Sequence, residues 1–241
     1  MSSWKHKVDH GSFAVKWLLR KQLVKKIEPR AAVDFYAGEG RLLLSLYGGF
    51  PSVHAVEKDP GKWSRLQQAV SRLEPGRVRT YLLDNRVFMR AVLPGIAEAN
   101  LLDFDAYGNP HPAIHDCFRH FRPRGRTAIA VTDGGRLALI RGSKINLASY
   151  LPGAFDSAPE LSARLNPLLV REYELLVNRF WSRLAHARGF QIIETIFAWK
   201  KARRVLYYGV VIEPDRDQVA RDRAHPSQPL EPEPDASRQI P

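Results

Sequence analysis

Hydrophobic and polar residues alternate along the chain with two different periods. Short apolar runs predict strands at residues 31–36, 53–57, 77–83, 100–105 and 127–131. Between them, apolar residues recur at helical spacing and predict helices at residues 40–47, 60–73 and 112–121, with a fourth helix ending near residue 93. Strands that alternate with helices are typical of a parallel sheet covered on both faces. The pattern therefore predicts an α/β fold.

The C-terminal part of the pattern differs from this alternation. The segment 134–159 has no clear period, and the helix that follows it ends at Gly189. Two strands, at residues 191–199 and 205–212, then flank the basic segment 200–204 and predict a hairpin, which brings the expected strands to seven. Residues 214–241 contain six prolines and no aromatic residue, so we expect this tail to be disordered.

An amphipathic helix is predicted at residues 11–28, ahead of the first strand. A membrane surface can bind such a helix. We favour packing of its apolar face on the domain, which leaves its basic face to solvent or a phosphate backbone. Residues 1–30 thus form a basic N-terminal helix, and residues 31–213 form the main domain. The apolar positions are Phe13, Trp17, Leu18, Leu19, Val24 and Ile27; the basic ones are Lys16, Arg20, Lys21, Lys25 and Lys26.

The net charge of the chain indicates a kind of binding partner. The chain of 241 residues carries +12, and the tail from residue 214 holds six acidic residues against four arginines, so residues 1–213 carry +14. Such an excess indicates a polyanion, most plausibly nucleic acid, but charge alone does not distinguish this from a generally basic surface without a nucleic-acid role. No apolar stretch is long enough to cross a bilayer, and Cys117 is the only cysteine, which excludes an internal disulfide and a cysteine-based metal cluster. We expect a cytoplasmic protein that uses no metal.

The first strand ends in two glycines, Gly38 and Gly40, and a helix begins directly after them. Glycines in such a turn let the backbone approach a ligand closely. Glu57 ends the second strand, where a carboxylate can accept hydrogen bonds from the hydroxyls of a ribose. Together these features predict a nucleoside-containing cofactor. A dinucleotide site would need a third glycine where Leu43 stands, and Asp34 would repel phosphates.

The spacing D-x-x-x-G-x-G with a later acidic residue resembles the first two motifs of class I methyltransferases, which bind S-adenosylmethionine. The C-terminal hairpin resembles the antiparallel seventh strand of that class, so the resemblance implies a seven-stranded Rossmann-like sheet. It also implies the cofactor contacts. Asp103 has a structural role or meets the methionine amine, and Asp84 and Asn85 meet the adenine ring, a role compatible with capping a helix. The cofactor residues are thus Asp34, Tyr36, Gly38, Gly40, Glu57, Asp84, Asn85 and Asp103.

The end of the fourth strand indicates the acceptor. The sequence of residues 103–110, D-F-D-A-Y-G-N-P, resembles the motif D-x-D-P-F/Y-G-S-P of the tRNA guanine-N2 dimethyltransferase family, and residues 130–135 resemble that family's fifth-strand end. The resemblance covers roughly residues 34–133 and departs at Ala106, where the family has proline. It implies methyl transfer to guanine N2 in RNA, with Asp105 accepting the amine N–H and Tyr107 stacking on the base.

Cations outside these motifs are expected to bind the RNA backbone. Two alternatives stay open. The first is a DNA methyltransferase acting on adenine N6 or cytosine N4, although those enzymes usually carry N/D-P-P-Y/F at this site. The second is a nucleic-acid-binding protein that keeps the fold without catalysis. The predicted RNA-binding residues are Arg136, Arg141, Lys144, Lys200 and Lys201.

Overall fold

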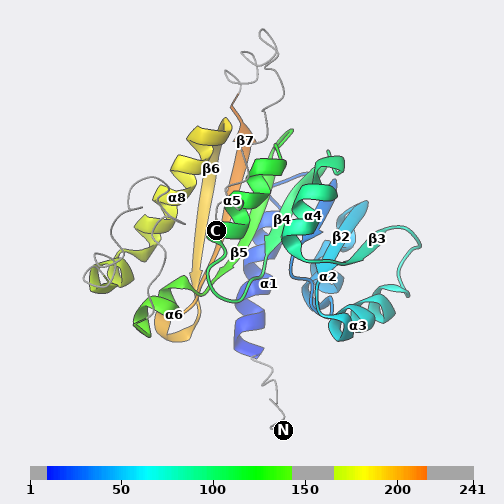
Figure 1. Ribbon diagram of the computed structural model, residues 1–241, viewed down its shortest axis with the longest axis horizontal. Helices are drawn as coiled ribbons and strands as arrows, with labels where there is room; N and C mark the ends of the chain where they lie inside the picture. Colours follow the sequence, from blue (N-terminus) through cyan, green and yellow to red (C-terminus); the bar gives the residue numbers. More distant parts are fainter. Residues whose placement is uncertain (1–9, 143–165, 216–241) are drawn as a thin grey trace, which may run out of the picture.

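The computed structural model describes residues 10–142 and 166–215. Within these ranges it contains a seven-stranded sheet with helices on both faces (Figure 1). The sheet order is β3-β2-β1-β4-β5-β7-β6; β7 runs antiparallel to both its neighbours, and the pairs among β1 to β5 are parallel. The predicted α/β fold with an antiparallel C-terminal hairpin is confirmed. The strands are β1 (Ala31–Asp34), β2 (Ser52–Glu57), β3 (Val78–Leu82), β4 (Ala99–Phe104), β5 (Thr127–Asp133), β6 (Phe190–Trp199) and β7 (Leu206–Pro214).

The helices divide between the two faces of the sheet according to which strand residues they cover. Alternate residues of β1 point to opposite faces, so Ala32 belongs to one apolar cluster and Val33 to the other. The Ala32 side is covered by α1 (His10–Val24), α2 (Arg41–Leu46) and α3 (Pro60–Val70). The Val33 side is covered by α4 (Asn85–Ala91), α5 (His111–His120) and α8 (Tyr173–Arg188). Short 3₁₀ helices are η1 (Tyr47–Gly49), η2 (Leu93–Gly95) and η4 (Lys201–Arg203).

Local chemistry explains where several helices begin and end. Asp59 caps α3 by accepting the N–H of Lys62 at 2.9 Å, and Pro60 occupies the first turn. Gly189 ends α8 in the left-handed conformation at φ 68°, as predicted. The segment 134–159 lacks a period in the sequence; its first part forms α6 (Gly135–Ile140) directly after β5, and residues 143–159 lie outside the described part of the chain. A helix of six residues is too short to show a repeat.

The face that α1 turns toward the sheet differs from the predicted one. Leu19 and Leu23 are buried, but Leu18 is 55% exposed and the Arg20 side chain has no exposed surface. The expectation that Arg20 meets solvent or phosphate is therefore wrong. A Cβ on Gly209 would lie 2.6 Å from the Leu23 side chain, so this glycine lets α1 lie close against β7.

The end of the domain also shifts by one residue relative to the prediction. β7 runs to Pro214, and the N–H of Asp215 donates to the Gly189 carbonyl at 3.0 Å. Pro214 thus belongs to the sheet and not to the tail. The expected disorder of the tail concerns residues that, from 216 onward, lie outside the described part of the chain.

Candidate active site

Three carboxyl groups gather at the carboxyl ends of β1 and β4. Asp34 and Asp103 are register partners on these neighbouring strands, and Asp105 follows two residues later on the same side of the sheet. Asp34 and Asp103 are both buried. Because a buried carboxylate without a partner is costly, this edge of the sheet requires compensating charge or protonation.

Arg20 supplies the compensation for Asp103. Its Nε and one terminal nitrogen donate to the two carboxylate oxygens at 2.7 and 2.6 Å, and the Tyr47 hydroxyl donates to the same carboxylate. Asp103 has no exposed surface. Of the two roles left open for Asp103, the structural one fits this arrangement, and the assignment of Asp103 to the cofactor is revised accordingly. Because removal of the Asp103 carboxylate from water is costly, the buried carboxylate needs a cation beside it, and Arg20 from another element supplies this charge.

Asp105 is held from two sides but keeps contact with solvent. The Lys16 ammonium lies 2.6 Å from Oδ1 and donates to Oδ2 at 2.8 Å, and the Thr132 hydroxyl donates to Oδ1 at 2.5 Å. Its side chain is 18% exposed. Burial alone would raise the pKa of Asp105, but the nearby charges of Arg20 and Lys16 and the two hydrogen bonds outweigh it, so the pKa is lowered. Asp105 is therefore an ionised hydrogen-bond acceptor at the edge of the sheet.

The pKa of Asp34 is shifted in the opposite direction to that of Asp105. Burial, followed by the charge of Asp103, raises its pKa well above the usual range, although its carboxyl accepts the N–H of Tyr36 at 3.1 Å. A neutral Asp34 leaves the two cations Lys16 and Arg20 matched by the carboxylates of Asp103 and Asp105. A cationic ligand beside Asp34 would favour its ionised form.

The two glycines of the first turn have different roles. Both have positive φ, 56° at Gly38 and 81° at Gly40. A Cβ on Gly40 would lie 2.7 Å from Leu66 Cδ1, so Gly40 serves the packing of α3. A Cβ on Gly38 would meet nothing nearer than 4.0 Å, so this part of the turn faces open space. Glu57 supports the turn, because its Oε2 accepts the Gly38 N–H at 3.0 Å.

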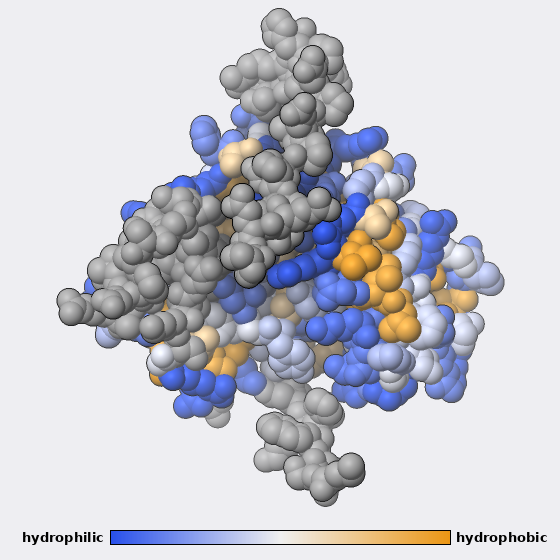
Figure 2. Space-filling model, in the orientation of Figure 1, coloured by the Kyte–Doolittle hydropathy of each residue, from blue (hydrophilic) through white to orange (hydrophobic). Residues whose placement is uncertain are grey.

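The residues predicted to meet adenine lie at the start of α4. Asp84 caps this helix by accepting the N–H of Arg86 at 2.9 Å. The side chain of Asn85 bonds to the Tyr36 hydroxyl, while its Oδ1 atom is buried without a hydrogen-bond partner. Leu82 and Val87 are exposed nearby, and Figure 2 shows hydrophobic surface on the side of the molecule that carries β3 and α4. An orphaned acceptor beside apolar surface fits an amino-substituted aromatic ring.

Tyr107 projects from the loop after β4 and is 95% exposed. The loop itself is fixed next to it. Gly108 has φ 88°, its carbonyl accepts the Gly134 N–H at 2.7 Å, and a Cβ on Gly134 would lie 3.2 Å from Gly108 backbone atoms. Two glycines thus join the β4 and β5 loops, and the aromatic ring next to them is left available to a ligand.

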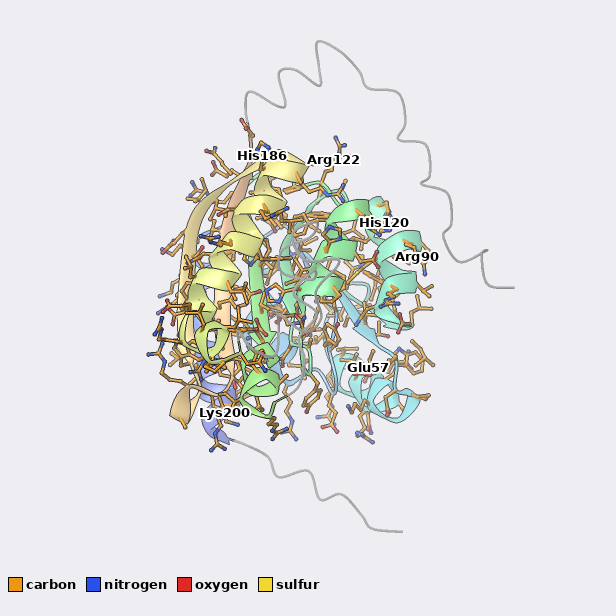
Figure 3. The ribbon with its side chains drawn as sticks, turned by 60° about the vertical axis from the view of Figure 1, so that its left-hand side comes forward. Glu57, Arg90, His120, Arg122, His186 and Lys200 are labelled. Atoms are coloured by element: carbon orange, nitrogen blue, oxygen red, sulfur yellow. The ribbon has the colours of Figure 1, made fainter. Side chains whose placement is uncertain are left out.

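The described members of the predicted RNA-binding set have different surroundings. Arg136 donates to the carbonyls of Val170, at 2.9 Å, and Arg203, and its guanidinium lies 5.2 Å from the Trp199 ring centroid, so it ties α6 to the hairpin. That arrangement gives Arg136 a structural role, and its contact with RNA stays a prediction. Arg141 is exposed at the end of α6. Lys200 lies at the same end of the molecule as Glu57 (Figure 3). Lys144 and the side chain of Lys201 lie outside the described part of the chain.

Sequence reasoning missed four residues that build this site: Lys16, Arg20, Tyr47 and Thr132. Two signals pointed to them: the spacing of the two cations, four residues apart on one helical face, and the resemblance at residues 130–135, which include Thr132. That spacing was interpreted as a solvent-facing stripe, because nothing in the local sequence shows which elements a helix meets in space.

A second buried polar cluster lies on the Val33 side of the sheet, next to the loops that follow β4 and β5. Asn109 Oδ1 accepts the Nδ1–H of His111 at 2.8 Å, and the Tyr208 hydroxyl is 3.2 Å from His111 Nε2. Asp133 lies 3.8 Å from the same imidazole and accepts the Tyr173 hydroxyl at 2.9 Å. Burial lowers the pKa of His111 and raises that of Asp133 to about 7.

Asp133 should make stability depend on pH in a direction that can be measured. Its pKa is about 7 when folded and near 3.8 in its ordinary state, so the folded protein holds this proton more tightly. The free energy of unfolding should therefore fall by about 1.4 kcal/mol per pH unit as pH rises between these values. Asp133→Asn removes this contribution. Urea unfolding of both proteins from pH 4.5 to 8 checks it, and parallel curves would contradict the assignment.

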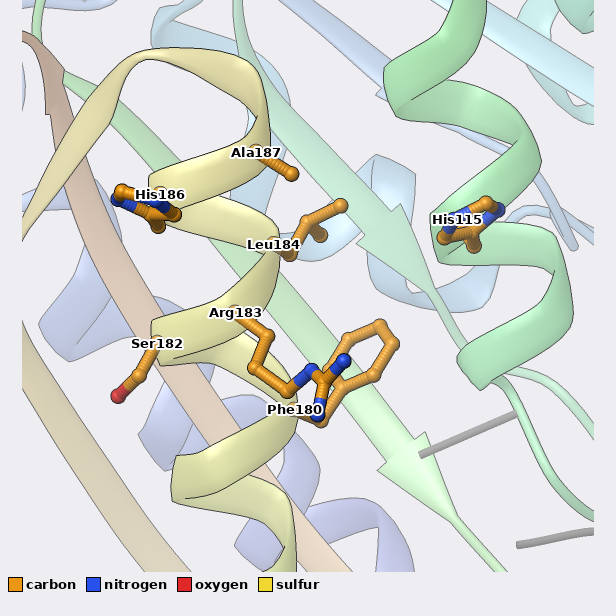
Figure 4. A pocket seen from close by; sticks show the side chains of 7 residues that line it. All are labelled: His115, Phe180, Ser182, Arg183, Leu184, His186 and Ala187. Carbon is orange, nitrogen blue, oxygen red and sulfur yellow. The ribbon is translucent and has the colours of Figure 1, made fainter. Parts of the chain in front are cut away.

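A hollow of about 510 Å³ lies elsewhere, between α5 and α8 (Figure 4). His115 faces Leu184 and Ala187 across it. His186, which also lines it, lies at the opposite end of the molecule from Glu57 (Figure 3). No carboxylate is among the lining residues of this hollow, so the acidic edge of the sheet is the better candidate for chemistry.

Two kinds of feature are absent from the described residues. No described helix is both long and apolar enough to span a membrane. Across residues 10–142 and 166–215, no group of three or more histidine, cysteine, aspartate or glutamate side chains is arranged to hold a metal ion.

Comparison with known proteins identifies the fold. No family model and no curated protein matches the sequence. Among solved structures, TYW2 from M. jannaschii, in complex with AdoMet, is 16% identical over 87% of this chain and 79% of its own, with a TM-score of 0.55. Trm1 from Pyrococcus horikoshii, with S-adenosyl-L-methionine, is 13% identical over 87% of this chain and 57% of its own, with a TM-score of 0.60.

A third similar structure is an N-methyltransferase. The N-methyltransferase NodS from Bradyrhizobium japonicum WM9, in complex with S-adenosyl-L-homocysteine, is 10% identical over 88% of this chain and 91% of its own, with a TM-score of 0.51. All three align over most of this chain and share its architecture. The chain therefore has the fold of the class I S-adenosylmethionine-dependent methyltransferases.

Proposed function

We propose that the protein transfers a methyl group from S-adenosylmethionine to an exocyclic amino nitrogen of a nucleic-acid base, and specifically to guanine N2 in RNA. The observation that carries this proposal is the Asp105 carboxylate, which is ionised and partly exposed and lies two residues before Tyr107, whose side chain is exposed. The charge of +14 on residues 1–213 supports a polyanionic substrate.

The residues around the glycine turn fit the cofactor. Gly38 faces open space, and each carboxylate oxygen of Glu57 accepts one backbone N–H, which leaves lone pairs for the ribose hydroxyls. The orphaned Oδ1 of Asn85 can accept the adenine amine, with Tyr36 beside it. Asp34 can meet the methionine amine. When bound, S-adenosylmethionine supplies an electrophilic methyl group on a sulfonium and departs as a thioether.

Asp105 has a defined task in this reaction. An exocyclic amine is a weak nucleophile, because its lone pair is delocalised into the ring. By accepting one amine N–H at Oδ2, Asp105 orients the nitrogen and stabilises the positive charge that grows on it. The nitrogen lone pair forms the new bond to carbon while the carbon–sulfur pair returns to sulfur. Since the pKa of Asp105 is lowered, the carboxylate does not retain the released proton, which passes to solvent at the exposed edge.

Tyr107 would hold the base. An exposed tyrosine ring provides a flat apolar surface, and stacking of a base on an aromatic side chain contributes about 1–3 kcal/mol. The glycine contact between the β4 and β5 loops fixes the backbone on which this ring is carried. The alanine at position 106, where the resembled family has proline, leaves this fixation to the contact of Gly108 with Gly134.

Labelled cofactor tests the proposed acceptor. The protein is incubated with methyl-labelled S-adenosylmethionine and separate pools of total RNA, DNA and protein, followed by nucleoside mass spectrometry. We expect label in RNA as an N2-methylated guanosine. Label in DNA as N6-methyladenine or N4-methylcytosine would favour the DNA alternative. Cofactor binding without transfer to any pool would favour a non-catalytic nucleic-acid-binding protein. Label confined to protein would contradict the proposal.

A further inference from the structure

We propose that Lys16 of α1 is a positioning residue of the acceptor site, which holds the Asp105 carboxylate so that its Oδ2 atom remains open to the incoming amine. This inference rests on the proposed function, since it assigns Asp105 to an acceptor. It adds the N-terminal helix α1 to the acceptor site, although the sequence predicted that the basic residues of this helix lie on the outer surface.

The contacts around Asp105 distinguish its two oxygens. Oδ1 lies 2.6 Å from the Lys16 ammonium, accepts the Thr132 hydroxyl at 2.5 Å and lies 3.9 Å from the Arg20 guanidinium. Oδ2 accepts a hydrogen bond from Lys16 alone, at 2.8 Å, among the contacts of the described residues. A carboxylate oxygen can accept two hydrogen bonds, so Oδ2 has capacity for an amine N–H. Lys16 and Thr132 together fix the plane of the carboxylate.

Lys16 can perform this task because α1 is anchored one turn further along. Arg20, four residues later, is fully buried in its bidentate pair with Asp103. Leu23 lies against Gly209 of β7, and the Lys16 ammonium lies 5.9 Å from the centroid of the Tyr207 ring on the same strand. The position of the ammonium is therefore set by a helix that is itself fixed to the sheet. The Lys16 side chain is 21% exposed, which leaves the pair at the border of solvent.

Removal of this ammonium changes the electrostatics as well as the geometry. Asp105 is surrounded by charged and titratable groups from every element packed against it. Without Lys16, the charge of Arg20 would be shared between Asp105 and the carboxyl groups of Asp34 and Asp103. The pKa of Asp105 should therefore rise toward its ordinary value or above. Fewer molecules would then hold an ionised acceptor at mildly acidic pH. The groups are Lys16 and Arg20 of α1, Asp34 of β1, Tyr47 of η1 and Asp103 of β4.

Kinetics of Lys16→Met and Lys16→Arg test the inference. For Lys16→Met we expect kcat to fall by about 10- to 100-fold at neutral pH, with the acidic limb of the rate profile moved to higher pH. The KM for the cofactor should not change. Lys16→Arg keeps the charge and should retain most of the rate. The control is Arg119→Met on α5, which removes an exposed cation on the other side of the sheet and should leave the rate unchanged.

A second readout does not depend on catalysis. Titration of the Asp105 carboxyl by ¹³C NMR, assigned with Asp105→Asn, should give a higher pKa in Lys16→Met than in the wild type or in Arg119→Met. An unchanged titration together with an unchanged kcat would overturn the inference. So would a fall in kcat with an unshifted pH profile, which indicates a merely structural role. If the wild type methylates no nucleic acid, the proposed function fails, while the NMR titration still decides whether Lys16 controls Asp105.

Discussion

Asp105→Asn is expected to reduce methyl transfer by about 10²- to 10⁴-fold while the affinity for the cofactor stays within a factor of about three. The substitution keeps the shape of the side chain and its hydrogen bond from Thr132, but it removes the negative charge that stabilises the methylated nitrogen. Single-turnover transfer with saturating cofactor measures the first quantity, and calorimetric titration measures the second.

A matched control separates the loss of charge from a general effect. Asp116 lies on α5, away from the acidic edge, and forms only a long contact of 4.0 Å with His120. Asp116→Asn should leave the transfer rate unchanged. If Asp105→Asn instead weakens cofactor binding as much as it slows transfer, Asp105 orients the cofactor and does not contact the acceptor.

Arg20→Met is expected to destabilise the protein by about 3–5 kcal/mol, because it leaves the Asp103 carboxylate buried without a charge partner. The double variant Arg20→Met, Asp103→Asn has no unpaired charge, and its amide can still accept the Tyr47 hydroxyl, so part of the loss should be recovered. Urea unfolding at pH 7 gives the three free energies.

The control for this prediction is an exposed ion pair. Arg65 pairs with Glu39 at 2.8 Å, but both side chains are more than one third exposed. Arg65→Met should therefore change stability by less than about 1 kcal/mol. A comparably small effect of Arg20→Met would contradict the claim that a buried ion pair fixes α1 to the sheet.

The parts of the fold that were predictable are those in which local sequence decides the structure. Strand and helix alternation, the glycine turn at Gly38 and the stop at Gly189 depend on neighbouring residues, and they were located to within a few positions. The hairpin that supplies β6 and β7 was equally visible, because two apolar runs flank a short basic turn. These features were enough to identify the class of fold.

The features that escaped prediction depend on groups that meet only in three dimensions. Arg20 is buried because Asp103 lies opposite it, 83 residues away in the chain. Arg136 was expected to bind RNA, but backbone carbonyls at residues 170 and 203 take its donors. Net charge predicted a polyanionic partner, which stays a prediction, and it could not tell a solvent-facing cation from one that neutralises a buried carboxylate.

For the same reason, only some residues of the candidate site could be predicted from the sequence. The carboxylates Asp34, Glu57 and Asp105 were found because each ends or follows a strand, where the chain direction places them at one edge. The roles of Asp34 and Glu57 toward the cofactor, and of Tyr107 toward the base, stay predictions. The partners that tune Asp105 come from α1 and β5, and no local pattern connects those elements to it.

Calorimetric titration of S-adenosylmethionine into the wild-type protein tests the central claim, that the acidic edge of the sheet is a cofactor site. We predict binding with one site per chain and, in the pH range where the free protein holds Asp34 protonated, release of a proton, because the cationic ligand lowers the raised pKa of Asp34. Asp34→Asn should bind more weakly and release no proton. Absence of binding at high micromolar cofactor, or identical proton release from Asp34→Asn, would contradict this account.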